Sequence, residues 1–184
     1  MAADFNQKAF ENLSYGLYIV TSRNENRLNG QIVNTVFQVT SQPPRVAVII
    51  NKKNLTHEYI CHSRVFGVSV LEQAAPMTFF GPFGFKSGRD YDKFSKVEFR
   101  EGAAGCPLIT QYSLSILESK VFDQIDLGTH TIFMGDVVTS EVLKEGTALT
   151  YLYYKQNLKG KSSPLSPTYN PNRLSGNAPH GMLD

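Results

Sequence analysis

The chain has 184 residues, and its 18 Lys and Arg against 16 Asp and Glu give a formal net charge of +2. A balance this even gives no electrostatic reason to expect a nucleic-acid-binding protein, and 41% hydrophobic with 18% charged residues argues against disorder. No apolar run approaches the roughly 20 residues that a membrane-spanning helix needs.

The first predicted elements are a short helix and two strands. Asp4 is a suitable N-cap for a helix over residues 4–13, and a strand is expected over residues 17–22. The dipeptide Asn29-Gly30 is a typical hairpin signal, so a turn is expected there. A single strand over residues 31–39 should follow it.

The middle of the chain predicts two strands around a short helix. The continuous β-branched run over residues 45–50 predicts a strand covered on both faces. A helix over residues 55–62 and a strand over residues 65–71 follow. Residues 76–95, rich in Gly, Phe and charge, predict a long loop, and a loop of this length is usually functional or disordered.

Two long strands are expected in the second half, over residues 113–124 and 130–143. Most connections are too short for a crossover helix, so the sheet should be mostly antiparallel, and evenly spaced strands with few helices favour a closed barrel. The predicted organisation is a domain over residues 1–155 and an extended Pro-rich tail over residues 156–184, with four of the nine prolines.

The cysteine pattern bears on compartment and on metal binding. Cys61 and Cys106 are the only cysteines and form no Cys-x-x-Cys pair, which excludes a rubredoxin-type or zinc-ribbon site within this chain. Free thiols and an N-terminus without an apolar signal segment predict a cytoplasmic protein. His57 and His62 lie five residues apart, the wrong spacing for one face of a helix, so no metal site is expected.

Polar residues interrupt the strand that precedes Pro43-Pro44. Its alternation places Asn34 and Gln38 on one face, with Val36 between them. Polar groups in an apolar sheet need partners, which the edges of a flat heterocycle would supply. A half-exposed strand is the alternative explanation.

Two segments have the composition of an anion site. The run Asn51-Lys52-Lys53-Asn54-Leu55-Thr56 joins a buried strand to a helix start, where free N–H groups, a hydroxyl and lysines suit a phosphate. The Gly-containing basic loop around Lys86 to Lys93 can wrap an anion in the same way, although it is not a Walker loop. Ordinary N-capping and a solvated surface loop are the alternatives.

His130 opens the last long strand at a sheet edge, and no nucleophile or base accompanies it. A strand-end histidine of this kind is commonly a surface or hydrogen-bonded residue. No Gly-x-Ser-x-Gly motif is present to make it part of a hydrolase site.

The order of these motifs resembles the flavin-reductase-like, FMN-binding split-barrel family over about residues 8–155. The resemblance rests on the Asn/Thr strand before Pro-Pro, Asn-Lys-x-Asn-x-Thr at 51–56, Ser-Gly-x-Asp-x-Asp-Lys-Phe at 87–94 and His-Thr-Ile-Phe-x-Gly-Asp-Val at 130–137. The segment after Tyr153 further resembles the branch in which a flavin reductase domain is fused to rubredoxin.

This resemblance implies a mostly β fold with short helices, namely a six-stranded antiparallel, Greek-key-like split β-barrel that forms a homodimer with FMN at the subunit interface. It implies that the isoalloxazine ring lies along Asn34, Thr35, Val36, Phe37 and Gln38, with His130 near it. It implies that the phosphate is held by Asn51, Lys52, Asn54 and Thr56, helped by Lys86, Ser87, Gly88 and Lys93.

The implied function is an NAD(P)H:flavin oxidoreductase, with FMN as cofactor and NADH or NADPH as co-substrate. Electrons would pass to free flavin, rubredoxin or a flavodiiron protein. A flavoredoxin-like electron carrier, reduced by another protein, is the alternative, and a tail that covers the ring would favour it. A pyridoxamine-phosphate-oxidase-like enzyme is a third reading for which no residue of a substrate pocket argues.

Overall fold

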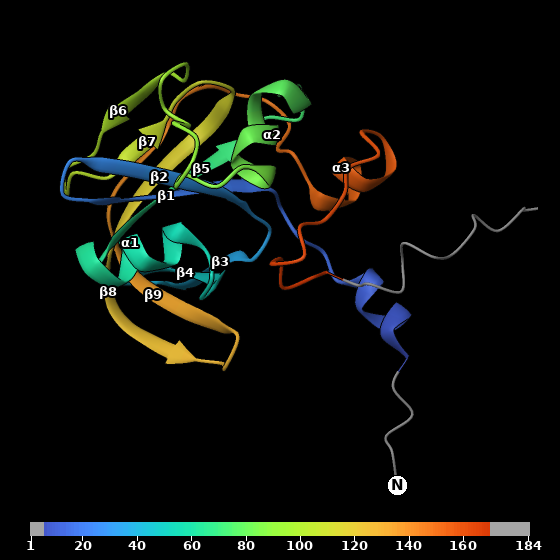
Figure 1. Cartoon of the computed structure of the whole chain (residues 1–184), viewed down its shortest axis with the longest axis horizontal. Coiled ribbons are helices and arrows are strands. Elements are labelled where there is room, and N and C mark those ends of the chain that lie inside the picture. Colours follow the sequence, from blue (N-terminus) through green and yellow to red (C-terminus); the bar gives the residue numbers. More distant parts are fainter. Residues whose placement is uncertain (1–5, 170–184) are drawn as a thin grey trace, which may run out of the picture.

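The structure, a computed structural model, describes residues 6–169 (Figure 1). In chain order the elements are η1 (Gln7–Asn12), β1 (Tyr18–Asn24), β2 (Arg27–Val33), β3 (Val36–Ser41), β4 (Pro44–Asn51), α1 (Leu55–Ser63), β5 (Val65–Leu71), α2 (Met77–Phe85), β6 (Phe99–Glu101), β7 (Pro107–Ile109), β8 (Ser113–Asp126), β9 (His130–Val142) and α3 (Tyr151–Gln156). The first helix, η1, is a 3-10 helix, and its predicted N-cap, Asp4, lies outside the described residues.

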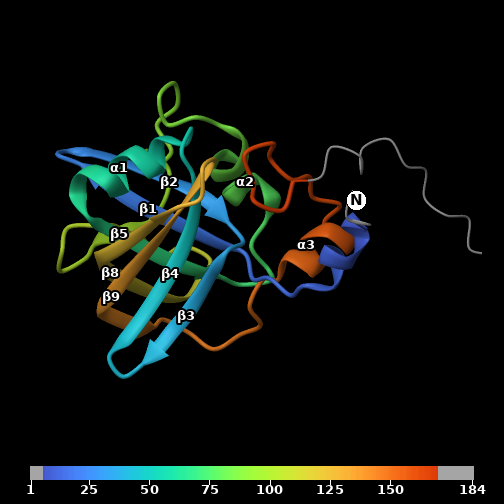
Figure 2. The same ribbon diagram turned by 90° about the horizontal axis from the view of Figure 1, so that it is seen from below.

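A seven-stranded antiparallel sheet, in the order β2-β1-β5-β8-β9-β4-β3, forms the barrel. The edge strands β2 and β3 are consecutive in the chain and only Asn34 and Thr35 join them, so the sheet must curl until its edges approach each other (Figure 2). Thr35 fixes this junction, because its Oγ1 donates to the Ile49 carbonyl and its own carbonyl accepts from Ile49 N, both at 3.1 Å. The predicted antiparallel barrel is confirmed.

The sheet has seven strands where six were expected, because the segment over residues 31–39 is divided between β2 and β3. The hairpin predicted at Asn29-Gly30 is wrong: the turn between β1 and β2 lies at Glu25-Asn26. Glu25 has a φ of 52°, so a non-glycine residue takes the left-handed conformation of this turn.

Close packing explains why Gly30 sits inside β2. A Cβ on this residue would lie 2.9 Å from Thr21 Cγ2 and 3.3 Å from Phe83 Cε1. The glycine therefore lets α2 approach the sheet, and its presence in the sequence is not a turn signal.

Two clusters of buried apolar side chains stabilise the fold. The inner cluster fills the barrel and includes Val20, Val48, Ile60, Phe66 and Phe133. The outer cluster includes Ile19, Leu71, Phe80, Phe83 and Tyr154. Because neighbouring residues of β1 belong to different clusters, this strand is buried on both faces.

Helix α2 corrects the prediction of a structureless loop over residues 76–95. Its sequence, Met-Thr-Phe-Phe-Gly-Pro-Phe-Gly-Phe, contains residues that disfavour a helix. Burial of Phe80 and Phe83 in the outer cluster outweighs this local preference. No helix in the described part of the chain is long and apolar enough to cross a membrane.

Beyond α3 the chain folds back towards the barrel (Figure 1). Residues 157–169 form turns and no regular element. We call residues 161–168 the strap. It is tied down where Tyr154 Oη donates to the Lys161 carbonyl at 2.7 Å and where Asn34 Nδ2 donates to Thr168 Oγ1 at 2.8 Å. The division of the chain at residue 155 stays a prediction.

Candidate functional site

A cavity of about 390 Å³ lies where β2, the start of α1, the end of α2 and the strap meet. Its lining includes four lysines and, among the described residues, neither Asp nor Glu. The lysines are Lys53, Lys86, Lys93 and Lys161. A concave site whose charged residues are all positive favours an anionic ligand.

The N-terminus of α1 borders this cavity through Asn54, Leu55 and Thr56. Asn54 is the N-cap, but its side chain makes no capping hydrogen bond. The first N–H groups of an α-helix have no partner within the helix, and the helix dipole adds positive potential there. This end of α1 is therefore suited to bind an anion.

Lys93 is a buried cation at the same cavity. Its side chain reaches β2, where Nζ donates to the Gly30 carbonyl at 2.7 Å. Burial lowers its pKa to about 8, and none of the ion pairs formed by the described residues includes it. An anion in the cavity would stabilise its charged form.

Asn29 is one of the cavity-lining residues that the sequence analysis missed, since it was assigned to a turn. It is only 2% exposed, lines the cavity and donates from Nδ2 to Thr56 Oγ1 at 2.9 Å. Its Oδ1 has no hydrogen-bond partner among the described residues. The local sequence around Asn29, Arg-Leu-Asn-Gly-Gln, gave no signal of this burial.

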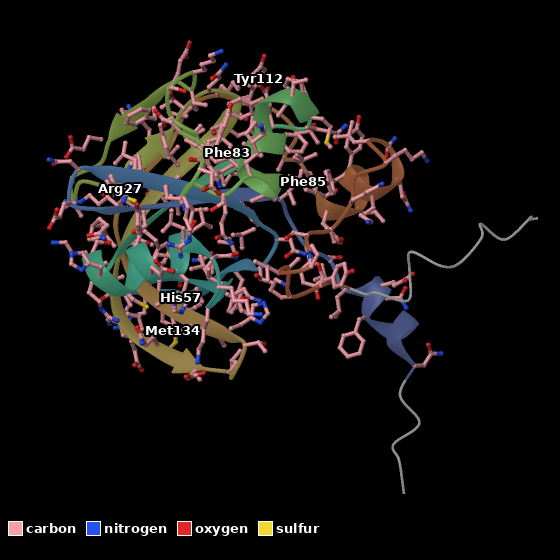
Figure 3. The ribbon with its side chains drawn as sticks, viewed as in Figure 1. Arg27, His57, Phe83, Phe85, Tyr112 and Met134 are labelled. Atoms are coloured by element: carbon pink, nitrogen blue, oxygen red, sulfur yellow. The ribbon has the colours of Figure 1, made fainter. Side chains whose placement is uncertain are left out.

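The loop after α2 closes the cavity from above with Lys86, Ser87 and Gly88. A Cβ on Gly88 would lie 2.1 Å from Asn29 Oδ1, so only glycine allows this approach of the loop to β2. In Figure 3, Phe83 lies over β2 and Phe85 lies on the side of α2 that faces α3.

The cavity brings together eight of the fourteen residues predicted for the site. They are Asn34, Asn51, Asn54, Thr56, Lys86, Ser87, Gly88 and Lys93. The six that do not line it are Thr35, Val36, Phe37, Gln38, Lys52 and His130. The roles of all fourteen stay predictions.

Two of the outlying residues lie at its border. Lys52 forms an ion pair with Asp126 on the β8–β9 hairpin, and the next residue, Lys53, lines the cavity in its place. His130 pairs with Asn51 in the sheet, with its Nε2 at 3.4 Å from Asn51 Nδ2. Its Nδ1 lies 2.8 Å from Thr129 Oγ1.

An apolar surface on the outside of the barrel borders the same cavity. The register places Phe37, Ala47 and Met134 side by side, followed by Ile49 opposite Ile132 and Ile125. Phe37 is 48% and Ile125 47% exposed. Figure 2 shows no other element of the drawn chain over this side of β3 and β4. We call this surface the outer face.

Within residues 6–169, no group of three or more His, Cys, Asp or Glu side chains is placed to hold a metal ion. The polar groups around the cavity are amides, hydroxyls and ammonium groups. They can bind and orient an anionic organic ligand.

Comparison with known proteins identifies the family of the chain. The flavin reductase like domain family matches residues 10–162. A ferric-chelate reductase (NAD(P)H) from Archaeoglobus fulgidus is 48% identical over 162 residues, 88% of this chain and 96% of that protein. A high molecular weight rubredoxin from Moorella thermoacetica is 45% identical over 166 residues, 90% of this chain and 72% of that protein.

A solved structure shares the fold. The flavin reductase HpaC complexed with NADP+ is 26% identical, with a TM-score of 0.68, and the match covers 79% of this chain and 90% of that one. The chain therefore belongs to the flavin reductase-like family and has the split-barrel fold of flavin reductases.

Proposed function

We propose that the chain is an NAD(P)H-dependent flavin oxidoreductase that holds FMN in the cavity. The names of two similar proteins, a ferric-chelate reductase (NAD(P)H) and a flavin reductase complexed with NADP+, support this activity. When bound, FMN would take a hydride from NADH or NADPH at N5 and release electrons to an acceptor. The cofactor carries this chemistry, and the protein supplies binding, orientation and electrostatics.

The observation that carries the proposal is the cation-lined end of the cavity. FMN has an anionic phosphate, and here the start of α1, the Thr56 hydroxyl and buried Lys93 converge on a space without carboxylates among its described lining residues. The residues present therefore fit the phosphate of this cofactor. Ser87 and Gly88 would cover it from the loop.

Amide and aromatic groups would hold the ring. Asn34 and Asn51 line the cavity, together with Tyr151, Tyr154 and Phe85. Their amides can donate hydrogen bonds to the edge of a flavin, and donors placed at the ring would favour its reduced, more negative form. No acid–base side chain is required for hydride transfer, so the role of His130 would be to adjust the rate.

A homodimer would complete the site. The outer face is apolar and partly exposed, and Ile49 belongs both to it and to the cavity lining. A second copy seated on this face would remove Phe37 and Ile125 from water. It would also bring the predicted ring residues Thr35, Val36, Phe37 and Gln38, together with His130, to the border between subunits, next to a cavity.

We propose rubredoxin or a flavodiiron protein as the physiological acceptor, with free flavin as the assay acceptor. The rubredoxin proposal is supported by a relative that is longer than this chain and is named a high molecular weight rubredoxin. Acceptor identity is testable by supplying reduced enzyme with rubredoxin, a flavodiiron protein, free FMN or a ferric chelate and comparing kcat/KM.

An electron carrier without direct NAD(P)H oxidation is the second candidate, and the strap favours it. Six strap residues line the cavity, and Thr168 Oγ1 accepts a hydrogen bond from Asn34 Nδ2. The six are Lys161, Ser162, Ser163, Leu165, Ser166 and Pro167. A covered ring would exchange electrons with a protein while excluding the nicotinamide.

Anaerobic titration separates the two functions. Purified protein is loaded with FMN, its flavin absorbance is recorded, and NADH or NADPH is added. The reductase proposal expects NADH or NADPH to bleach the flavin absorbance at a rate at least as fast as steady-state turnover. Failure of both nucleotides to bleach a flavin that dithionite does reduce would leave the carrier function, and failure to retain any flavin would contradict both.

A further inference from the structure

We infer that Asn29 is a positioning residue for the phosphate end of the cavity, acting by orienting the hydroxyl of Thr56. This inference rests on the proposed function, and it concerns a residue of β2 to which the sequence analysis gave no role. It rests on the hydrogen bond from Asn29 Nδ2 to Thr56 Oγ1, on the Asn29 Oδ1 atom, which has no partner among the described residues, and on the packing around both.

The strand holds Asn29 in a fixed place. It pairs with Ser22 of β1 inside the antiparallel ladder, and its side chain turns towards the start of α1. Both Asn29 and Thr56 are buried, so their hydrogen bond is shielded from water. A buried hydrogen bond between two rigid elements defines geometry better than an exposed one.

The direction of this hydrogen bond determines what Thr56 can do. A threonine hydroxyl has one proton to donate and two lone pairs that accept. Asn29 Nδ2 donates to Thr56 Oγ1, so one lone pair is used and the proton is free for another acceptor. The hydrogen bonds of the described residues include none in which Thr56 donates, and Thr56 lines the cavity. An anion bound in the cavity would supply the acceptor.

The surroundings of Asn29 belong to the same end of the cavity. Its Oδ1 lies under Gly88, close enough that any side chain there would collide with it. The next residue of β2, Gly30, accepts the hydrogen bond from Lys93 Nζ. Two successive residues of β2 thus position two groups at the cavity, the Thr56 hydroxyl and the Lys93 ammonium.

The test compares FMN with riboflavin, which lacks the phosphate, in fluorescence titrations of the full chain. Asn29→Ala is expected to weaken FMN about tenfold, the loss expected for one hydrogen bond to a charged group. Riboflavin affinity should change by less than about twofold. Ser22→Ala removes a buried hydrogen bond from the paired position of β1, outside the cavity, and should leave both affinities unchanged.

A double-mutant cycle tests whether Asn29 acts through Thr56. In a Thr56→Val background, Asn29→Ala should have less than about a twofold further effect on FMN. In a Thr56→Ser background, which keeps the hydroxyl, the tenfold effect should remain. A tenfold further loss of FMN affinity on adding Asn29→Ala to the Thr56→Val variant would show that the two residues act independently and would contradict the inference.

Asn29→Asp provides a variant of nearly the same shape if the alanine variant is unstable. A carboxylate accepts a hydrogen bond from the Thr56 hydroxyl and adds a negative charge, so FMN binding should weaken more than with alanine, while riboflavin binding changes little. Equal losses for both flavins would indicate a merely structural role and overturn the inference. If the unsubstituted chain binds neither flavin, both the proposed function and this inference fail. If the unsubstituted chain binds FMN and the Asn29→Ala variant binds it equally well, only this inference fails.

Discussion

Lys93 shows how a single buried charge connects ligand binding to stability. Its pKa is lowered to about 8 by desolvation, while an unfolded chain would hold the proton up to its ordinary value of 10.5. Between these values the unfolded state binds more protons than the folded state, so stability rises with pH across this window. Below about pH 8 the buried ammonium is a full cost to the ligand-free fold.

The first prediction is therefore that the free energy of unfolding of the flavin-free protein increases from about pH 8 to about 10.5. Lys93→Met should flatten this part of the profile, because the titrating group is removed. FMN affinity should fall as pH rises through about 8 in the native chain and be weaker and pH-independent in the variant. Denaturant unfolding and flavin titration across this range provide the measurements. If the free energy of unfolding of the Lys93→Met variant rose with pH as steeply as that of the native chain, another group would be responsible for the titration.

The second prediction distinguishes two neighbouring lysines. Lys53 lines the cavity, whereas Lys52 does not line it and forms an ion pair with Asp126. Lys53→Ala should weaken FMN about tenfold, and Lys52→Ala should have a smaller effect, because an exposed ion pair contributes little. The sequence analysis chose Lys52, so a larger effect of Lys52→Ala in the same titration would restore that assignment.

At the residue scale, the sequence could identify side-chain types suited to a phosphate but not which of two adjacent lysines lines the cavity. That choice depends on where β4 ends and α1 begins. Asn29 was missed because Asn-Gly has a strong local turn preference, and tertiary packing of Gly30 against Thr21 and Phe83 overrides it.

At the scale of elements, strands with buried faces were the most predictable parts. Strand β5 was predicted with its observed bounds, Val65–Leu71, because it is rich in β-branched and aromatic residues and is flanked by the charged residues Arg64 and Glu72. Helix α2 was not predictable from periodicity, since glycine and proline lie within it and its stability comes from burial of Phe80 and Phe83. The three-residue strands β6 and β7 are too short to show a period of two.

The strap leads to the third prediction. A chain that ends after Gly160 keeps the outer-cluster residue Tyr154 but loses the residues that cover the cavity. FMN should dissociate at least tenfold faster from it, since contacts and enclosure are both lost. NADH oxidation per bound flavin should increase if the strap limits access of the nicotinamide.

Thr168→Val is the matched control, because it removes the hydrogen bond from Asn34 and keeps the strap. It should show an intermediate dissociation rate in stopped-flow measurements. Identical rates in all three proteins would mean that the strap leaves the flavin exposed.

At the scale of the whole molecule, the outer face borders the cavity through Ile49, and the proposed homodimer would form on this face. The fourth prediction is that Phe37→Asp or Ile125→Asp converts a dimer to a monomer in analytical ultracentrifugation, because a charge cannot be buried unpaired in an apolar interface. The monomer should bind FMN more weakly although neither residue lines the cavity. Val142→Asp, at an exposed position near the end of β9, serves as the control. A dimer that persists in both outer-face variants would place the interface elsewhere.

The sequence pattern favoured a closed barrel but did not show where it closes, because residues 31–39 were predicted as one strand and are divided between β2 and β3. That closure depends on Asn34 and Thr35, a link of two residues that unites the first and last strands of the sheet. The same link presents Asn34 to the cavity. FMN bound in the cavity would contact the link between the two edge strands and restrain their separation. Amide hydrogen exchange along β2 and β3 should therefore slow when the protein is saturated with FMN.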